Sequence, residues 1–241
     1  MNFTYSEDQL LFQESVRDFL INEVSPEKIR SLWETETGRC DTLWGQLTEL
    51  GLTGLTVPES YGGLGMNELD FVLLAQEAGF VALPEPLVHI ALVSVPTLVK
   101  YASDALKAEW LPKIASGEAK VVVGLEQNLV VEDAHVADLL VLEKDGTVYA
   151  VTADQVELSF NESVDRSRRL YQVTFDEQAA ELIAEGQQAN DLVNDALNRG
   201  ALGSAAQALG LSQRMVEMSV QYTGERKQFG VAIGTFQAVK H

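Results

Sequence analysis

Basic residues are scarce in this sequence. Among its 241 residues, 17 Lys and Arg stand against 36 Asp and Glu, which gives a formal net charge of −19. The acidic residues are spread evenly along the chain, and no run of basic residues interrupts them. Because this charge opposes contact with phosphate backbones and anionic lipid surfaces, we expect no nucleic acid and no membrane among the partners.

Cysteine and long uninterrupted apolar runs are also missing. Cys40 is the single cysteine, which excludes an internal disulfide and a cysteine-based structural metal site and fits a cytoplasmic location. The most apolar stretch, residues 81–99, contains three prolines together with Glu85 and His89, so it does not predict a transmembrane helix. Residues 1–8 carry no basic residue ahead of an apolar stretch, so no signal peptide is expected.

The first half of the chain has helical periodicity. Ser6 and Gln9 have the spacing of a capping box ahead of an amphipathic helix, and Asp41 is predicted to cap a second helix. The glycine-rich segment 51–65 lacks the Lys and Ser/Thr spacing of a phosphate-binding loop, so we interpret it as a connection between helices. Together with the helical patterns that follow, these features predict an all-helical domain over residues 1–118.

Near Gly117 the apolar pattern changes from helical to β-like. Asp145-Gly146 is typical of a two-residue hairpin turn. The pattern predicts a small antiparallel β domain over residues 119–185. Its expected strands are five short runs: 121–125, 139–142, 148–151, 156–160 and 171–175.

A long helix is predicted after these strands. From Asp191 to about Thr223 the helical period continues without a proline. Gly200, Gly203 and Gly210 lie within it, and each costs about 1 kcal/mol of helix propensity relative to Ala. We expect these glycines to allow close approach of a neighbouring helix or a ligand. The same helix carries one apolar row at a spacing of four residues: Leu197, Ala201, Ala205 and Leu209.

Four motifs are spread over nearly the whole chain. They are Phe3–Gln9 with residues 16–19, the loop 51–65, residues 110–118, and residues 225–237. In this order they resemble the acyl-CoA dehydrogenase family. The resemblance implies a mainly α fold with a small β domain: an N-terminal helical bundle, a reduced antiparallel β unit, and the first part of a C-terminal helical bundle over residues 186–241.

The same resemblance implies an activity and its partners. Members of the family hold FAD and desaturate an acyl-CoA thioester, with a carboxylate taking the α proton and the flavin N5 taking the β hydride. We therefore expect FAD as the cofactor, an acyl-CoA as the substrate, electron-transferring flavoprotein as the electron acceptor, and another acyl-CoA dehydrogenase subunit as the partner. No metal is expected, because His89, His135 and His241 have no partners at ligand spacing.

The sequence departs from the family in two places. Gly124–Asn128 stands where a Leu-Thr-Glu-Pro stretch would begin, and the strands that surround the flavin ring in the family are missing after it. One branch of the family has its catalytic Glu in a late loop that would follow residue 241, and another has it at the position of Gly200. No catalytic residue is therefore assigned in this chain. Glu126 and the run Asp165 to Arg169 are interpreted as structural.

The cofactor-binding residues implied by the resemblance are Arg226, Phe229 and Gln237. They match residues that reach across a dimer interface to the FAD of another subunit, Arg at the pyrophosphate. The segment from Arg214 onward carries a net charge of +2, from four basic and two acidic residues, which suits a pyrophosphate. The alternative is an ordinary helix end, with Arg226 at the C-terminal dipole and Phe229 in the core.

Three hypotheses remain open from the sequence. In the first, the chain is a subunit of a heteromeric acyl-CoA dehydrogenase, similar to the reduced subunits of enzymes that degrade steroids and cholesterol side chains. It then contributes FAD contacts across a subunit interface rather than a complete active site. In the second, it is a non-catalytic scaffold of the same fold that binds no flavin. In the third, it is part of a longer subunit that carries its own base.

Overall fold

The computed structural model describes residues 4–241. Phe3, where the first motif begins, lies outside the described residues, as does part of the segment considered for a signal peptide. The helices of the N-terminal region are α1 (Glu7–Glu23), α2 (Pro26–Trp33), α3 (Asp41–Glu49), α4 (Glu68–Val81), α5 (Leu87–His89), α6 (Val95–Tyr101) and α7 (Asp104–Ala115). A π-helical turn over Ile90–Ser94 joins α5 to α6.

Local capping explains where these helices begin. The predicted capping box at α1 is confirmed: Ser6 Oγ accepts the Gln9 N–H at 3.2 Å, and Gln9 Oε1 accepts the Ser6 N–H at 2.9 Å. Helix α2 was not among the elements predicted from the sequence. Proline occupies the first turn of α2, where its missing N–H has no helical partner to lose. Asp41 lies in the first turn of α3, and Cys40 is the N-cap.

The strands form two small sheets. One sheet has the order β1 (Val121–Gly124), β3 (Leu139–Lys144), β4 (Thr147–Thr152) and β7 (Glu181–Ala184). The other has the order β2 (Val131–Glu132), β6 (Leu170–Phe175) and β5 (Val156–Asn161). The hairpin at Asp145-Gly146 is confirmed, with both residues at positive φ as a type I′ turn requires. All strand pairs are antiparallel except β1 with β3, which are parallel. Between these two strands the chain leaves the first sheet and forms β2 in the second sheet, and it then returns to the first sheet in the same direction.

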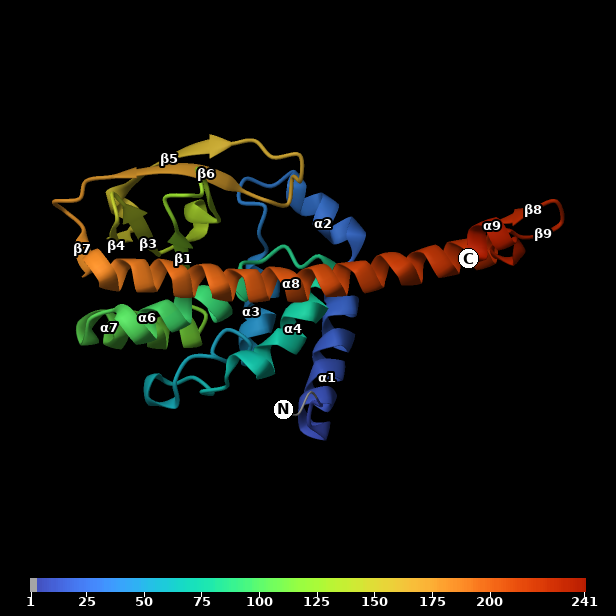
Figure 1. Ribbon diagram of the computed structural model, residues 1–241, viewed down its shortest axis with the longest axis horizontal. Helices are drawn as coiled ribbons and strands as arrows, with labels where there is room; N and C mark the ends of the chain where they lie inside the picture. Colours follow the sequence, from blue (N-terminus) through green and yellow to red (C-terminus); the bar gives the residue numbers. More distant parts are fainter. Residues whose placement is uncertain (1–3) are drawn as a thin grey trace.

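Helix α8 (Gly186–Glu225) is the longest element and organises the molecule. Figure 1 shows it between the strands on one side and helices α4, α6 and α7 on the other. Its C-terminal part leads away from these layers to the hairpin of β8 (Lys227–Gln228) and β9 (Val231–Ala232) and to α9 (Gln237–Lys240).

Glycine lets α8 and α4 approach closely. A Cβ on Gly210 would come within 1.8 Å of the Gln76 carbonyl oxygen, and one on Gly79 within 2.1 Å of the Gln207 carbonyl oxygen. A Cβ on Gly203 would lie 3.1 Å from Val88. The expected close approach is therefore present at Gly203 and Gly210.

Apart from Leu192, the buried face of α8 is made of small residues rather than of the apolar row. Ala189, Leu192, Ala196 and Ala206 belong to the core, whereas Leu197 and Leu209 are exposed. Small side chains are what a close helix contact requires, so the larger row faces away from α4. The main core joins the N-terminal helices, one face of the four-stranded sheet and the first half of α8.

Candidate functional site

A cavity of about 660 Å³ opens where the two helical layers and the strands meet. Its apolar wall comes from the α5–α6 region and β1, through Val88, Leu92, Val93 and Val122. Helix α8 contributes a row of small residues, Gly200, Gly203, Ser204 and Ala208. The polar end consists of Arg39, Glu85, His89, Glu132, Asp133 and Arg168. This size and mixture are typical of a small-molecule site.

Gly200 contributes space to this cavity. A Cβ at this position would lie 3.9 Å from Val93 Cγ2, an ordinary van der Waals distance, so packing does not require glycine there. The expected close approach is therefore absent at Gly200. At this point of α8 the wall is formed by the backbone of Gly200.

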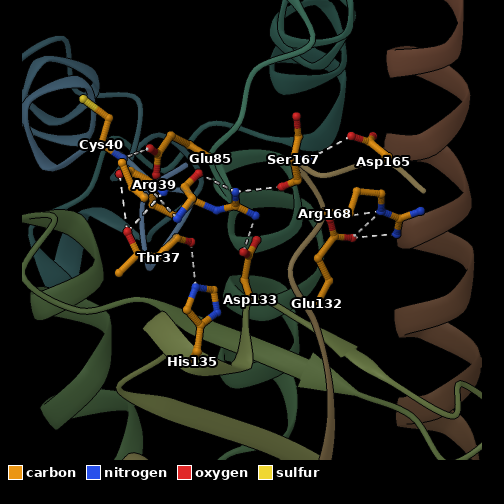
Figure 2. A network of polar contacts seen from close by, with 12 residues as sticks. Thr37, Arg39, Cys40, Glu85, Glu132, Asp133, His135, Asp165, Ser167 and Arg168 are labelled. Carbon is orange, nitrogen blue, oxygen red and sulfur yellow. Dashed lines mark hydrogen bonds and ion pairs between the residues drawn. The ribbon is translucent and has the colours of Figure 1, made fainter. Parts of the chain in front are cut away.

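The polar end of the cavity is built by segments far apart in the sequence (Figure 2). Arg39, between α2 and α3, forms a buried ion pair with Asp133 of the β region. Its Nη1 also donates to the carbonyl oxygens of Gly38 and Ser167, each at 2.9 Å. Burial raises the pKa of Asp133 to about 6, although the Arg39 guanidinium lowers it. One guanidinium thus ties the N-terminal helices to two loops of the β region.

Glu85 is the second buried acid at this end. Its Oε1 accepts the Cys40 N–H at 2.7 Å, and its Oε2 has no hydrogen-bond partner within residues 4–241. The residue is 7% exposed. Loss of hydration raises the pKa of Glu85 to about 7, so the carboxyl group is partly protonated at neutral pH.

His89 lies half-buried on the cavity wall beside these groups. The Val123 N–H donates to His89 Nε2 at 2.9 Å, which places the imidazole proton on Nδ1. Burial lowers the pKa of His89 to about 4, so the ring is neutral at physiological pH. His135 stacks on Tyr171 and contacts the Thr37 carbonyl oxygen at 2.8 Å, a structural role.

Every guanidinium on the cavity wall already has a carboxylate partner. Arg39 pairs with Asp133, Arg168 with Glu132 at 2.6 Å, and Arg199 with Glu68 at 2.6 Å. A diphosphate needs cations that are free to bind it. The wall therefore does not fit the pyrophosphate of FAD and suits an uncharged group.

The three predicted cofactor residues lie together at the other end of α8. Arg226 follows the last turn of α8, Phe229 is in the turn between β8 and β9, and Gln237 begins α9. Phe229 is 93% exposed with a φ of 52°, and its ring meets Phe236 edge-on at 6.2 Å. This exposure contradicts the alternative of a core phenylalanine.

Residues 226–241, which follow α8 and are called the tail below, carry charges that differ from those of the cavity. No salt bridge engages Arg226, Lys227 or Lys240 in the part of the chain that the structure describes. At about 1.5 Å of rise per residue, Arg226 lies roughly 40 Å along α8 from Gly200. Within the described residues these cations are thus available to an anion, and they lie far from the chain's own cavity.

Sequence reasoning missed Glu85 and His89 as parts of a site. The signal was a carboxylate and an imidazole inside the most apolar stretch of the chain, where they were interpreted only as interruptions. In residues 4–241 no cluster of His, Cys, Asp and Glu has the arrangement of a metal site, and none of the helices combines the length and apolarity of a membrane span.

Comparison with known proteins places the chain in a family. The N-terminal domain of acyl-CoA dehydrogenase matches residues 6–118, and the C-terminal domain of acyl-CoA dehydrogenase matches residues 190–241. The two ranges together cover more than half of the chain. The chain belongs to the acyl-CoA dehydrogenase family.

Individual relatives and solved structures agree with this assignment. The chain is 27% identical to acyl-CoA dehydrogenase IpdE2 of Mycobacterium tuberculosis, over 99% of this chain and 70% of that protein. The ChsE4-ChsE5 complex of M. tuberculosis has a similar fold, with a TM-score of 0.85 at 22% identity, covering 100% of this chain and 73% of that chain. The steroid ACAD Tcur3481-Tcur3483 has a TM-score of 0.82 at 22% identity, covering 98% of this chain and 72% of that chain. The expected fold class is confirmed.

Proposed function

We propose that this chain is a subunit of an FAD-dependent acyl-CoA dehydrogenase and that its C-terminal tail contacts the FAD of a partner subunit. The observation that carries the proposal is the separation of free cations from the cavity. Within residues 4–241 Arg226 has no salt-bridge partner, and it lies roughly 40 Å from Gly200 along α8. The guanidiniums of the cavity, in contrast, are all paired with carboxylates. One dinucleotide cannot bridge that distance.

The tail residues have the chemistry for such a contact. The planar Arg226 guanidinium can donate two parallel hydrogen bonds to a diphosphate, and Lys227 adds charge beside it. Phe229 presents an open aromatic face at the hairpin tip, and Gln237 presents an amide. FAD held by these residues and the partner subunit would supply the hydride acceptor for the desaturation of an acyl-CoA thioester.

The reacting acyl group belongs beside the flavin of the partner subunit, so the cavity of this chain is not assigned to the reaction. The name of the steroid ACAD Tcur3481-Tcur3483 supports a polycyclic acyl group, and the two-component ChsE4-ChsE5 complex supports a heteromer. Electron-transferring flavoprotein is the proposed electron acceptor, and the single cysteine supports a cytoplasmic location.

A scaffold that binds no flavin is the second candidate. The paired guanidiniums of the cavity favour it, because they leave no diphosphate site in this chain's own cavity. The tail favours the first candidate, because an exposed phenylalanine in the left-handed region is costly without a partner.

Flavin content distinguishes the two. The chain is purified alone and after co-expression with the full-length acyl-CoA dehydrogenase encoded nearest to it, and the visible spectrum of each sample is recorded. We expect a complex of both chains with a flavin absorption band. A complex without flavin supports the scaffold, and flavin on the chain alone contradicts a tail that contacts only a partner's FAD.

A further inference from the structure

The cavity has no role in the proposed reaction, yet it has the features of a binding site. Its volume is about 660 Å³, and its wall includes the apolar side chains of Val88, Leu92 and Val93. Apolar side chains that face such a space gain free energy when a ligand covers them and removes them from water. The cavity is therefore suited to a small organic molecule.

Helix α8 keeps this space open at Gly200. Glycine inside a helix is unfavourable relative to alanine. A Cβ at Gly200 would meet Val93 Cγ2 only at 3.9 Å, so the neighbouring side chains do not compensate for the glycine. Gly203 and Gly210 differ, because the helices approach them closely. A ligand that occupies the space beside Gly200 would supply the missing contacts.

Two polar groups on the wall are open to the cavity, unlike the enclosed atoms at its polar end. The Val123 N–H occupies Nε2 of His89, so the half-buried ring donates through Nδ1–H, which has no partner within residues 4–241 and is not enclosed by protein. The hydroxyl of Ser204 is exposed and also lacks a hydrogen bond in these residues, whereas the Ser212 hydroxyl on the same helix donates to a carbonyl oxygen four residues earlier. Both His89 and Ser204 line the cavity.

The charges of the wall favour a neutral ligand. Its guanidiniums are all paired with carboxylates, so an anion finds no free counter-ion, and the net charge of −19 repels it. Asp165 has no salt bridge within residues 4–241, but it is exposed to water and would attract a cation only weakly. A ring N–H and a hydroxyl match a neutral oxygen acceptor, in a carbonyl or a hydroxyl group.

We propose that the cavity is an additional binding site for a neutral, mainly apolar molecule, whose carbonyl or hydroxyl oxygen accepts hydrogen bonds from His89 and Ser204. This molecule is not the substrate, because the proposed FAD contact lies roughly 40 Å away along α8. The wall joins α8, the α5–α6 region and β1, so the bound molecule ties these layers together and stabilises the folded protein by mass action. The site does not depend on the proposed function of the tail.

Matched naphthalene derivatives test this site. The neutral ketones 1- and 2-acetylnaphthalene carry an acceptor, the ethylnaphthalenes lack it, and 2-naphthoate and 2-(aminomethyl)naphthalene carry charges. Dissociation constants are measured by displacement of the neutral fluorescent ketone Prodan, from the chain alone and from its complex with the partner subunit. We expect the neutral compounds to bind both samples, to raise their melting temperatures, and to bind more tightly than the charged ones.

His89→Gln tests the hydrogen bond. The glutamine oxygen can replace Nε2 as the acceptor of the Val123 N–H, but nothing in glutamine replaces Nδ1–H. The affinity for at least one ketone should fall about tenfold, whereas the affinities for the ethyl compounds should stay as in the native protein. Ser204→Ala should act in the same direction more weakly.

Gly200→Leu tests the location of the site. The leucine side chain would occupy the space beside Val93, so the affinity for every neutral probe should fall about tenfold or more, with a melting temperature no lower than that of the native protein. The control Ala201→Leu adds leucine at the adjacent exposed residue, outside the cavity lining, and should leave every affinity unchanged.

Three results would overturn the inference. They are neutral probes that fail to bind the complex, ketone and ethyl affinities that change equally in His89→Gln, and native affinities in a folded Gly200→Leu chain. The comparison of ketone and ethyl compounds in His89→Gln still decides the matter if Gly200→Leu fails to fold. Each of these results leaves the proposed function standing, because flavin content tests the tail separately.

Discussion

The carboxyl group of Glu85 lies in a buried environment that distant parts of the chain build together. Its environment is assembled from the loop before α3, the segment between α4 and α5, and the region around β2. None of these contacts is local in sequence. Periodicity could mark Glu85 as unusual within an apolar stretch, but only the tertiary structure brings Cys40 and Asp133 beside it. The cavity was for that reason not predicted.

Stability should fall as the pH rises through the titration of Glu85. Burial raises the pKa of this carboxyl from 4.5 to about 7. The stabilisation that comes from the raised pKa is complete when the pH is below the pKa of Glu85 in the unfolded chain. It is lost as the pH rises through the pKa of Glu85 in the folded protein. The shift corresponds to about 3 kcal/mol of unfolding free energy between roughly pH 4.5 and 7.5.

Urea unfolding at several pH values measures this effect, with Glu85→Gln as the comparison. Gln has no ionisable proton, so the free energy of unfolding of the variant relative to the native protein should rise with pH over that interval. Asp133 and His89 titrate in both proteins and largely cancel in the difference. A difference that stays flat with pH would contradict the assigned burial of Glu85.

At the scale of secondary structure, sequence periodicity predicted the elements that are long or clearly patterned. The α1 capping box, the Asp145-Gly146 hairpin and the long helix α8 all appear where expected. Strand β2 was missed because it has only two residues, and β7 was missed because its Glu-Leu-Ile-Ala sequence fits a helix as well as a strand. Their pairing depends on distant strands, which no local pattern encodes.

Two glycines of α8 should respond oppositely to the same substitution. Gly210→Ala should destabilise the protein by about 1–3 kcal/mol, because the added Cβ would overlap the Gln76 carbonyl oxygen. Gly200→Ala, with its nearest contact at 3.9 Å, should be neutral or stabilise by up to about 1 kcal/mol through helix propensity. Thermal and urea unfolding of the two variants give the comparison. Equal effects at both positions would contradict the close contact of α4 with α8.

At the scale of the whole molecule, the negative charge lies in the helical and β layers, whereas the C-terminal end is positively charged. The chain carries −19, yet the segment from Arg214 onward carries four basic and two acidic residues. In Figure 1 this end of α8 and its hairpin lie apart from the helical and β layers. Family motifs predicted the fold and named Arg226, Phe229 and Gln237. Their separation of roughly 40 Å from the cavity could not be predicted from the sequence, because the position of the cavity along α8 is known only from the structure.

Flavin retention by the complex measures the proposed role of the tail most directly. The native chain, Arg226→Ala, and the control Arg30→Ala are each co-purified with the partner subunit, and the flavin absorbance is compared at equal protein and equal subunit ratio. Arg30 is an exposed arginine of α2, far from the tail in sequence. We predict at least a severalfold loss of flavin with Arg226→Ala, with assembly and melting temperature unchanged, and native flavin content with Arg30→Ala. Native flavin content in an intact Arg226→Ala complex would contradict the account.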